Sequence, residues 1–308
     1  MFTFSNRFEI GVLGPFQVGV DGRPVDMTGS KRDALLALLA LRRGRHVPVD
    51  TLIDELWGAD VPAAPRNAVQ HHIARLRAAL GQTSIVGCRD GYAVVGATTD
   101  AIVFEGLLVR ARAAGREGDP RTAADLADRA LALWRGPALQ GLPEIGWLRA
   151  EADRLEDLRI DALEERFEAA LALGEHREIV SELQHAIDEC PFRERLWRQL
   201  MLALYRSGRQ ADALEAYRTA RRVHVDQLGL EPGPELRRIQ DAILAHDPEL
   251  AAAPAPAVQP AEELDERRRE LGRVLDQMRE NLRHAEELYE RACSAAAGDD
   301  LELATLAA

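Results

Sequence analysis

Residues 64–81 read APRNAVQHHIARLRAALG, and this stretch decides how the N-terminal part of the chain folds. Pro65 suits the first turn of a helix, where no backbone donor is needed, and Gly81 suits its end. Apolar residues recur at spacings of four, three and four, which predicts one buried stripe made of Val69, Ile73, Leu76 and Leu80. The helix contains no carboxylate. Its other faces carry Arg66, Asn67, Gln70, His71, Ala74, Arg75 and Arg77.

A helix with one buried side and an outer side of Arg, Asn, Gln and small residues fits the major groove of DNA. Arginine can bind guanine edges or phosphates, and Asn and Gln can bind adenine edges. The same pattern also describes an ordinary amphipathic helix with a basic outer face. The sequence around the helix has to distinguish these two interpretations.

That surrounding sequence predicts a winged helix-turn-helix with small β-sheets. Strands precede the basic helix, two further helices lie between them, and a hairpin follows it. In such a fold the later helix enters the major groove, and an arginine at the hairpin tip can reach the adjacent groove. The expected elements are strands 8–13 and 16–20 around Asp21-Gly22, helix 31–43 capped by Ser30, helix 51–57, the basic helix, and strands 84–88 and 92–95 around Arg89-Asp90-Gly91.

Three separate motifs carry a family resemblance. They are Leu52–Gly58 (LIDELWG), Asn67–Arg77 (NAVQHHIARLR) and Gly91–Val94 (GYAV). They resemble the signatures of OmpR-type winged-helix regulators, and more closely those of the Streptomyces antibiotic regulatory protein (SARP) family. In that family the winged helix is followed by an all-helical bacterial transcriptional activation domain. The resemblance covers about residues 8–250.

The resemblance implies which residues meet DNA and RNA polymerase. Base-facing positions of the family fall on His71, Arg75 and Arg77, although position 71 is His where a Thr- or Val-like residue is expected. The loop between the two helices of the helix-turn-helix is the expected polymerase-facing element. The complete expected set is Lys31, Arg66, Asn67, Gln70, His71, Ala74, Arg75, Arg77 and Arg89 for DNA, and Trp57, Gly58 and Asp60 for polymerase.

Composition fits an intracellular regulator. The 308 residues are enough for about two domains. No apolar run is long enough to span a membrane, and residues 1–7 lack the apolar core of a signal peptide. Three cysteines, widely spaced and odd in number, argue against a disulfide framework. The expected location is therefore the cytoplasm, in association with the nucleoid.

Charge is distributed unevenly along the chain. The formal net charge is −12, which at first argues against a DNA-binding protein. Residues 62–99, however, hold four Arg and a single acidic residue, Asp90. Exposed charges are screened beyond roughly 8 Å at physiological salt, so attraction to phosphates is decided locally. The acidic remainder weakens nonspecific DNA binding without excluding it.

From about Asp100 onward the pattern is helical. Glycines and alanines twelve residues apart share one register in three pairs: Gly118 with Ala130, Gly174 with Ala186, and Gly208 with Ala220. Gly174 and Gly208 are 34 residues apart, which is the tetratricopeptide period. A tetratricopeptide-like helical domain is the preferred interpretation, and a generic helical bundle is the alternative.

The C-terminal tail begins with an Ala/Pro-rich linker. Beyond it, Leu264, Leu271 and Met278 recur every seven residues. This spacing predicts a coiled-coil helix, and a lone amphipathic helix is the alternative. The expected domains are 1–98 (winged helix), 99–248 (activation domain), 249–261 (linker) and 262–296 (C-terminal helix).

An enzyme is not expected. The sequence has no phosphate-binding loop, no C-x-x-C pair and no G-x-S-x-G turn. His71 and His72 are adjacent and so point away from each other on a helix, which argues against a metal site. The other histidines past residue 100 are expected to be solvated: His176, His185, His224, His246 and His284. No cofactor and no metal is predicted.

The sequence therefore predicts a mainly α protein that activates transcription. By resemblance, it binds direct repeats in double-stranded promoter DNA as a homodimer. It recruits RNA polymerase, including the sigma factor, to a secondary-metabolite gene cluster. The alternative is a helical-repeat interaction scaffold without sequence-specific DNA binding, but that function leaves the carboxylate-free basic helix unexplained.

Overall fold

A computed structural model of the chain describes residues 8–25, 29–88 and 90–251. Its N-terminal part contains a four-stranded sheet in the order β3-β2-β1-β7. β2 and β3 pair in antiparallel fashion around the predicted turn, where Asp21 and Gly22 both have positive φ angles. β7 pairs with β1 in parallel and was not predicted. The strands are β1 (Phe8–Gly11), β2 (Gln17–Val20), β3 (Arg23–Val25) and β7 (Ala97–Thr99).

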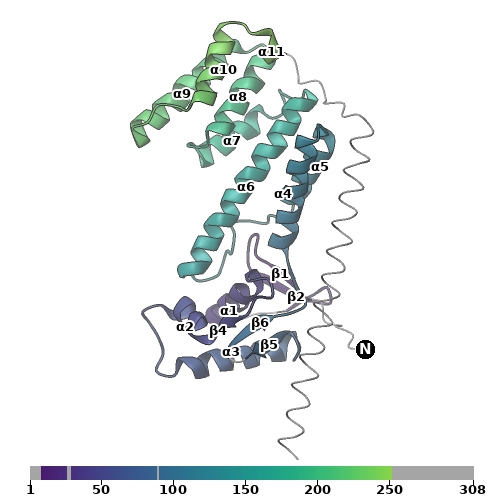
Figure 1. The fold of residues 1–308 in the computed structure, drawn as a ribbon, viewed down its shortest axis with the longest axis vertical. Coiled ribbons are helices and arrows are strands. Elements are labelled where there is room, and N and C mark those ends of the chain that lie inside the picture. The colour runs from purple at the N-terminus through teal and green to yellow at the C-terminus, as the bar shows by residue number, and fades with distance from the viewer. Residues whose placement is uncertain (1–7, 26–28, 89, 252–308) are drawn as a thin grey trace, which may run out of the picture. The chain divides into compact units, whose positions relative to one another are not determined.

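Three helices and a second small sheet complete the winged helix (Figure 1). The second sheet has the order β4-β6-β5, with β5 and β6 forming the predicted hairpin. The fold class is therefore confirmed for this region. The elements are α1 (Ser30–Leu41), β4 (Val47–Pro48), α2 (Val49–Trp57), α3 (Pro65–Leu80), β5 (Ile85–Cys88) and β6 (Gly91–Val94).

One local prediction in this region is wrong. Ser30 does not cap α1, because it is the first residue of the helix and Gly29 occupies the N-cap position. No side chain at the N-cap bonds the free N–H groups of the first turn. Gly29 has a φ of 154°, a conformation that glycine adopts at little cost, so the chain enters the helix one residue earlier than predicted.

The rest of the described chain is helical and forms packed helix pairs (Figure 1). Thr99 caps α4 by accepting the N–H of Ile102, and Asp119 caps α5 by accepting the N–H of Thr122. The helices are α4 (Asp100–Arg116), α5 (Pro120–Leu131), α6 (Gly146–Leu173), α7 (Val180–Glu189), α8 (Glu194–Arg206), α9 (Gln210–Leu228), α10 (Pro234–Leu244) and α11 (Pro248–Ala251).

The predicted glycine–alanine register agrees with the observed turns and helix contacts. Gly118, Gly174 and Gly208 all have φ angles between 75° and 88° and lie just after helices α4, α6 and α8. A left-handed glycine lets the chain leave one helix and reverse into the next. Their partners in the register, Ala130, Ala186 and Ala220, are all buried in the hydrophobic cores of the helical region.

The described chain has two hydrophobic cores, and they do not divide at residue 98. The first contains side chains from Phe8 to Ala169, and the second contains side chains from Ile160 to Ile243. The winged helix and the beginning of the helical region therefore share one core. The expected boundary at 98/99 stays a prediction. So does the linker 249–261, of which only residues 249–251 are described, at the end of the chain's last described helix. The predicted helix 262–296 lies outside the described residues.

One carboxylate connects the two sequence regions. Asp100, at the start of α4, accepts the backbone N–H groups of Val12 at 2.8 Å and Leu13 at 3.2 Å. It also accepts Nη2 of Arg135 at 2.9 Å. Gly11 leaves room for this arginine, because a Cβ there would lie 2.4 Å from Arg135 Nη2.

A second connection lies at the other side of the winged helix. The backbone N–H of Trp147, at the start of α6, donates to Glu55 Oε2 at 3.1 Å. The guanidinium of Arg42 stacks over the Trp147 ring at 4.3 Å from its centroid. Arg42, which directly follows α1, and Glu55 of α2 thus both contact the first turn of α6.

No helix in the described ranges is both long and apolar enough to cross a membrane.

Gly91 supplies a stability prediction. A Cβ at Gly91 would lie 2.1 Å from the carbonyl oxygen of Val47, on the neighbouring strand of the β4–β6 pair. We expect Gly91→Ala to lower the free energy of unfolding by about 1–3 kcal/mol, because backbone must move to relieve the overlap. Urea denaturation followed by circular dichroism measures this.

Gly106→Ala is the control for this variant. Gly106 lies within α4 and is exposed, and a Cβ added there would have no neighbouring atom within 4 Å. Alanine should therefore stabilise the protein by about 0.5–1 kcal/mol through helix propensity. Equal effects of the two substitutions would contradict the role given to Gly91.

Candidate nucleic-acid interface

Helix α3 has the two faces that its sequence predicts. Val69, Ile73, Leu76 and Leu80 are at most 1% exposed and pack into the first core. Pro65 is the first residue of the helix, and Gly81 ends it with a φ of 103°. The outer face is open to solvent and carries six of the predicted DNA-binding residues: Arg66, Asn67, Gln70, His71, Ala74 and Arg75.

Arg75 and Arg77 have different surroundings. Among the described residues, Arg75 has no hydrogen-bond or ion-pair partner and is exposed. Arg77 is half-buried, and its Nε donates to the carbonyl oxygen of Ile85 at 2.9 Å. Its guanidinium also lies 5.9 Å from the centroid of the Tyr92 ring. Arg77 therefore joins α3 to both strands of the β5–β6 hairpin, whereas Arg75 is available to a ligand.

Lys31 lies at the start of α1 and is half-buried. Its ammonium donates to the carbonyl oxygen of Leu56, in the last turn of α2. A cation is favourable at the C-terminus of a helix, where carbonyl groups lack partners. Lys31 thus ties α1 to α2 in this structure. The contact of Lys31 with DNA stays a prediction. It would use the N–H groups of the ammonium that do not bond Leu56.

Trp57 and His72 fix the end of α2 against α3. Their rings are stacked, with centroids 6.3 Å apart and an interplanar angle of 28°. Burial lowers the pKa of His72, and the nearby positive charges of His71, Arg32 and Arg75 lower it further. The neutral imidazole is the form that packs against the indole without a desolvated charge.

The three candidate polymerase residues differ in exposure. Trp57 is half-buried because of its stacking, while Gly58 and Asp60 are exposed in the α2–α3 loop. Gly58 has a φ of 53°, and the N–H of Asp60 donates to the carbonyl oxygen of Trp57 at 2.9 Å. The loop thus begins with a tight turn that presents its next residues to solvent.

The hairpin is held by its neighbours as well as by Arg77. The backbone N–H of Val49 donates to the carbonyl oxygen of Asp90 at 2.8 Å. The imidazole of His46 lies 3.7 Å from the carboxylate of Asp90. Arg89, the predicted tip residue, lies outside the described residues, so its contact with DNA stays a prediction.

Arg66 has a partner that the sequence did not reveal. Its Nη2 lies 2.6 Å from Oδ1 of Asp50, in the first turn of α2. The two residues are sixteen positions apart and belong to different helices. No local spacing rule relates them, so only the packing of α2 on α3 brings them together.

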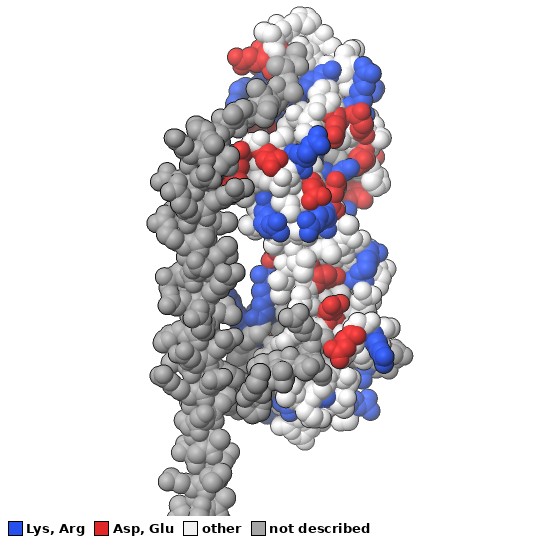
Figure 2. Space-filling model, turned by 90° about the vertical axis from the view of Figure 1, so that its right-hand side faces the viewer, with Lys and Arg blue, Asp and Glu red and all other residues white. Residues whose placement is uncertain are grey.

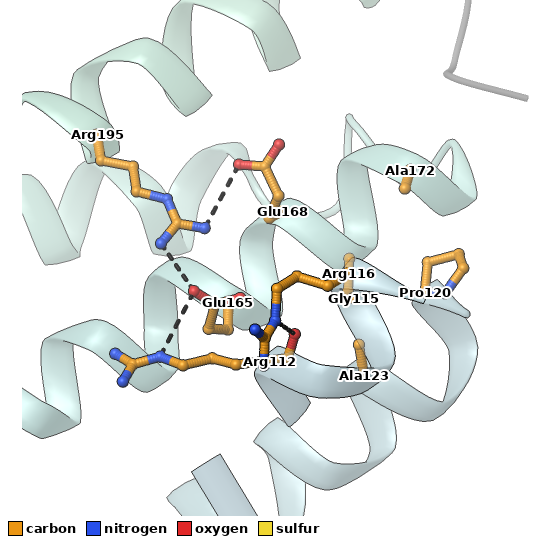
Figure 3. A pocket seen from close by; sticks show the side chains of 10 residues that line it. Arg112, Gly115, Arg116, Pro120, Ala123, Glu165, Glu168, Ala172 and Arg195 are labelled. Atoms are coloured by element: carbon orange, nitrogen blue, oxygen red, sulfur yellow. Dashed lines mark hydrogen bonds and ion pairs between the residues drawn. The ribbon is translucent and has the colours of Figure 1, made fainter. Parts of the chain in front are cut away.

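The helical region contains a groove of about 560 Å³ that the sequence did not predict. Gly115, Ala123 and Ala172 contribute to its lining (Figure 3). Glu165 Oε1 lies 2.8 Å from Arg195 Nη1 and 3.8 Å from Arg112 Nε. These ion pairs join α4, α6 and α8, so the charges that line the groove largely neutralise one another.

Ion pairs of this kind are common in the helical region. Figure 2 shows acidic and basic side chains interleaved over one face of the described residues. Arg193, for example, lies 2.9 Å from Asp157 and 3.0 Å from Asp161. The negative charge of this region is therefore distributed among pairs and does not form a single acidic face in this view.

The prediction that the later histidines are solvated is not met at two positions. His176 is half-buried, and burial lowers its pKa. His224 is only 4% exposed. Its Nδ1 lies 2.8 Å from the carbonyl oxygen of Ala220, one turn earlier in α9, and its ring meets that of Phe192 edge to face. The flanking charges face solvent from other sides of the helix, which is why the local sequence was misleading.

In the described ranges, no group of three or more His, Cys, Asp or Glu side chains could hold a metal ion.

Comparisons with known proteins match both regions of the chain. Residues 22–89 match a family described as "Transcriptional regulatory protein, C terminal". Residues 99–244 match a family described as "Bacterial transcriptional activator domain". The two matches follow each other in the order that the sequence motifs predict.

Individual relatives match most of the chain. Regulatory protein AfsR of Streptomyces coelicolor is 40% identical over 260 residues, which are 83% of this chain and 26% of AfsR. The chain thus spans about a quarter of that relative. Regulatory protein DnrI of Streptomyces peucetius is 37% identical over 78% of this chain and 93% of DnrI. The solved structure of Mycobacterium tuberculosis EmbR in complex with a low-affinity phosphopeptide has a TM-score of 0.74 at 32% identity, covering 78% of this chain and 66% of that chain.

Proposed function

This chain belongs to the Streptomyces antibiotic regulatory protein family of transcriptional regulators, and from that premise we propose that it activates transcription by binding promoter DNA through α3 and the β5–β6 hairpin. The relatives are named regulatory proteins, and the proposed function of this chain involves no catalysis. The proposed site of action is the bacterial nucleoid in the cytoplasm.

The exposed, carboxylate-free face of α3 is the observation that carries this proposal. Its N-terminal half offers Arg66, Asn67, Gln70 and His71 to solvent. Guanidinium and amide groups form paired hydrogen bonds with purine edges in the major groove. The opposite face is buried, so the helix can enter a groove without exposing apolar surface. Arg77 supports this arrangement by fixing the hairpin beside α3.

The number of base pairs that one winged helix can read favours binding as a pair. A single small module contacts few bases, so useful specificity requires two copies on adjacent sites. We propose direct repeats, which need a head-to-tail arrangement of the DNA-binding regions. The helical region would then supply the contact between the two copies.

Activation would follow from contacts with polymerase. The α2–α3 loop exposes Gly58, Asp60 and Val61 beside the proposed DNA-binding helix. A protein surface there could bind the sigma factor of RNA polymerase at a weak promoter and lower the free energy of polymerase binding. By family resemblance, the proposed targets are genes of a secondary-metabolite cluster.

DNA binding gives the main test. Footprinting of the full-length protein on genomic promoter fragments should reveal protected direct repeats and identify the genes beside them. Arg75→Ala should weaken binding to the footprinted site by about 1–3 kcal/mol, because an exposed guanidinium that meets DNA is lost. Its thermal stability should match that of the wild type.

Arg77→Ala is the matched variant for this test. It should lower thermal stability, since the bond to Ile85 and the packing on Tyr92 are both lost. If the full-length protein protects no DNA at any salt concentration, the scaffold function replaces the proposal. If it protects DNA but both variants bind as the wild type does, α3 is not the reading helix.

Transcription in vitro tests the polymerase contact. Asp60→Ala should reduce activated transcription from the target promoter without changing DNA affinity, because Asp60 is exposed on the loop and has no part in the buried stripe of α3. Asp125→Ala, an exposed acidic residue on α5, is the control for charge. Normal activation by the Asp60 variant would show that Asp60 does not contribute to the contact with polymerase.

Deletion of residues 261–308 tests assembly. We expect the shortened protein to retain cooperative binding to the direct repeat, because the helical region should hold the two copies together. Gel-shift titrations on one and two repeat units measure the cooperativity, and light scattering measures the mass in solution. Loss of cooperativity on deletion would instead show that the predicted C-terminal helix, residues 262–296, is the principal element of assembly.

A further inference from the structure

The pair formed by Asp50 and Arg66 has a special position in the molecule. Arg66 is the second residue of α3, and the first residues of a recognition helix are those that reach base edges. Asp50 belongs to α2, yet its carboxylate reaches this end of α3, a helix that contains no carboxylate of its own. The pair therefore brings a negative charge to an otherwise carboxylate-free helix.

Burial does not explain this ion pair. The side chain of Arg66 is 60% exposed and that of Asp50 is 73% exposed. Pairs in such surroundings contribute little to folding because water and salt screen them. The consequence of the pair lies instead in the orientation of the Arg66 guanidinium and in the charge beside it.

We propose that Asp50 is a specificity-determining residue, which holds one edge of the Arg66 guanidinium so that the other edge is presented to a guanine in the major groove. The proposal rests on the proposed function, since it requires that α3 binds DNA. Asp50 itself touches no base in this account. It acts through Arg66.

The geometry of guanidinium explains how this would work. An arginine has five N–H donors in a planar fork, and one carboxylate oxygen of Asp50 engages Nη2 at 2.6 Å. The donors on the remaining edge match the O6 and N7 acceptors of guanine. Without Asp50 the long side chain is free to rotate, and it can bind any nearby phosphate equally well.

The charge of Asp50 adds a second effect. A carboxylate at the end of α3 repels phosphates of every sequence alike. It therefore weakens nonspecific binding, whereas a guanine that binds Arg66 offsets the repulsion. Removal of the charge should raise affinity for random DNA and reduce the ratio of specific to nonspecific affinity.

Asp50→Asn in the full-length protein is the test, with Asp54→Asn as the matched control. Asp54 is exposed on the same helix, one turn further on, and is not paired with Arg66. Both substitutions remove one negative charge from α2. Affinity is measured by fluorescence anisotropy for the footprinted site, for that site with each base pair changed singly, and for random DNA.

We expect Asp50→Asn to reduce the ratio of specific to nonspecific affinity by at least about fivefold, the lower limit for loss of one paired arginine–guanine contact. The lost discrimination should be confined to one G·C base pair. Arg66→Ala should lose discrimination at that same base pair, and the double variant should lose no more than Arg66→Ala does. Asp54→Asn should leave the ratio unchanged.

Two results would overturn the inference while leaving the proposed function intact. One is an unchanged ratio for Asp50→Asn in a protein that binds its footprinted site. The other is a larger gain for specific than for random DNA, which would mean that Asp50 holds Arg66 away from its base. Absence of DNA binding by the wild type would instead refute the proposed function itself. Thermal denaturation of each variant separates these effects from unfolding.

Discussion

The carboxylate of Asp100 is the interaction on which the arrangement of the described chain depends. It accepts hydrogen bonds from the two backbone N–H groups that directly follow β1 and from the guanidinium of Arg135. One side chain thus joins the segment after β1, the start of α4 and the loop after α5. Thr99 caps α4 from the preceding strand, and β7 pairs with β1. No flexible connection therefore separates the winged helix from the first helical pair, and their apolar side chains form one core.

This connection has a consequence for the proposed DNA-binding surface. Helix α2 contacts α6 through Glu55 and the N–H of Trp147, and it contacts α3 through the stacking of Trp57 on His72. The position of α3 is therefore supported from the helical region through α2.

The arginines of the two regions differ in their ion pairing. In the helical region, arginines such as Arg195 and Arg193 are paired with carboxylates of α6 and join neighbouring helices. On α3, Arg75 has no such partner among the described residues, and Arg66 has one partner on another helix. The net charge of the chain is negative, yet α3 offers basic and amide side chains to an anion without any carboxylate of its own.

Local patterns in the sequence specify the helices and the composition of their faces. The apolar spacing in α3 predicted its four buried side chains correctly, and the glycine–alanine register predicted the turns after α4, α6 and α8, because helix periodicity and glycine conformation are local properties. The sequence also identified the family. The contacts of the polar side chains follow only from the tertiary structure. Arg77 bonds the β5–β6 hairpin, Arg66 pairs with Asp50, and His224 is buried. The pairing of β7 with β1 was likewise not visible in the sequence. These outcomes depend on residues that are distant in the chain, and no local pattern specifies which distant group will lie within hydrogen-bonding distance.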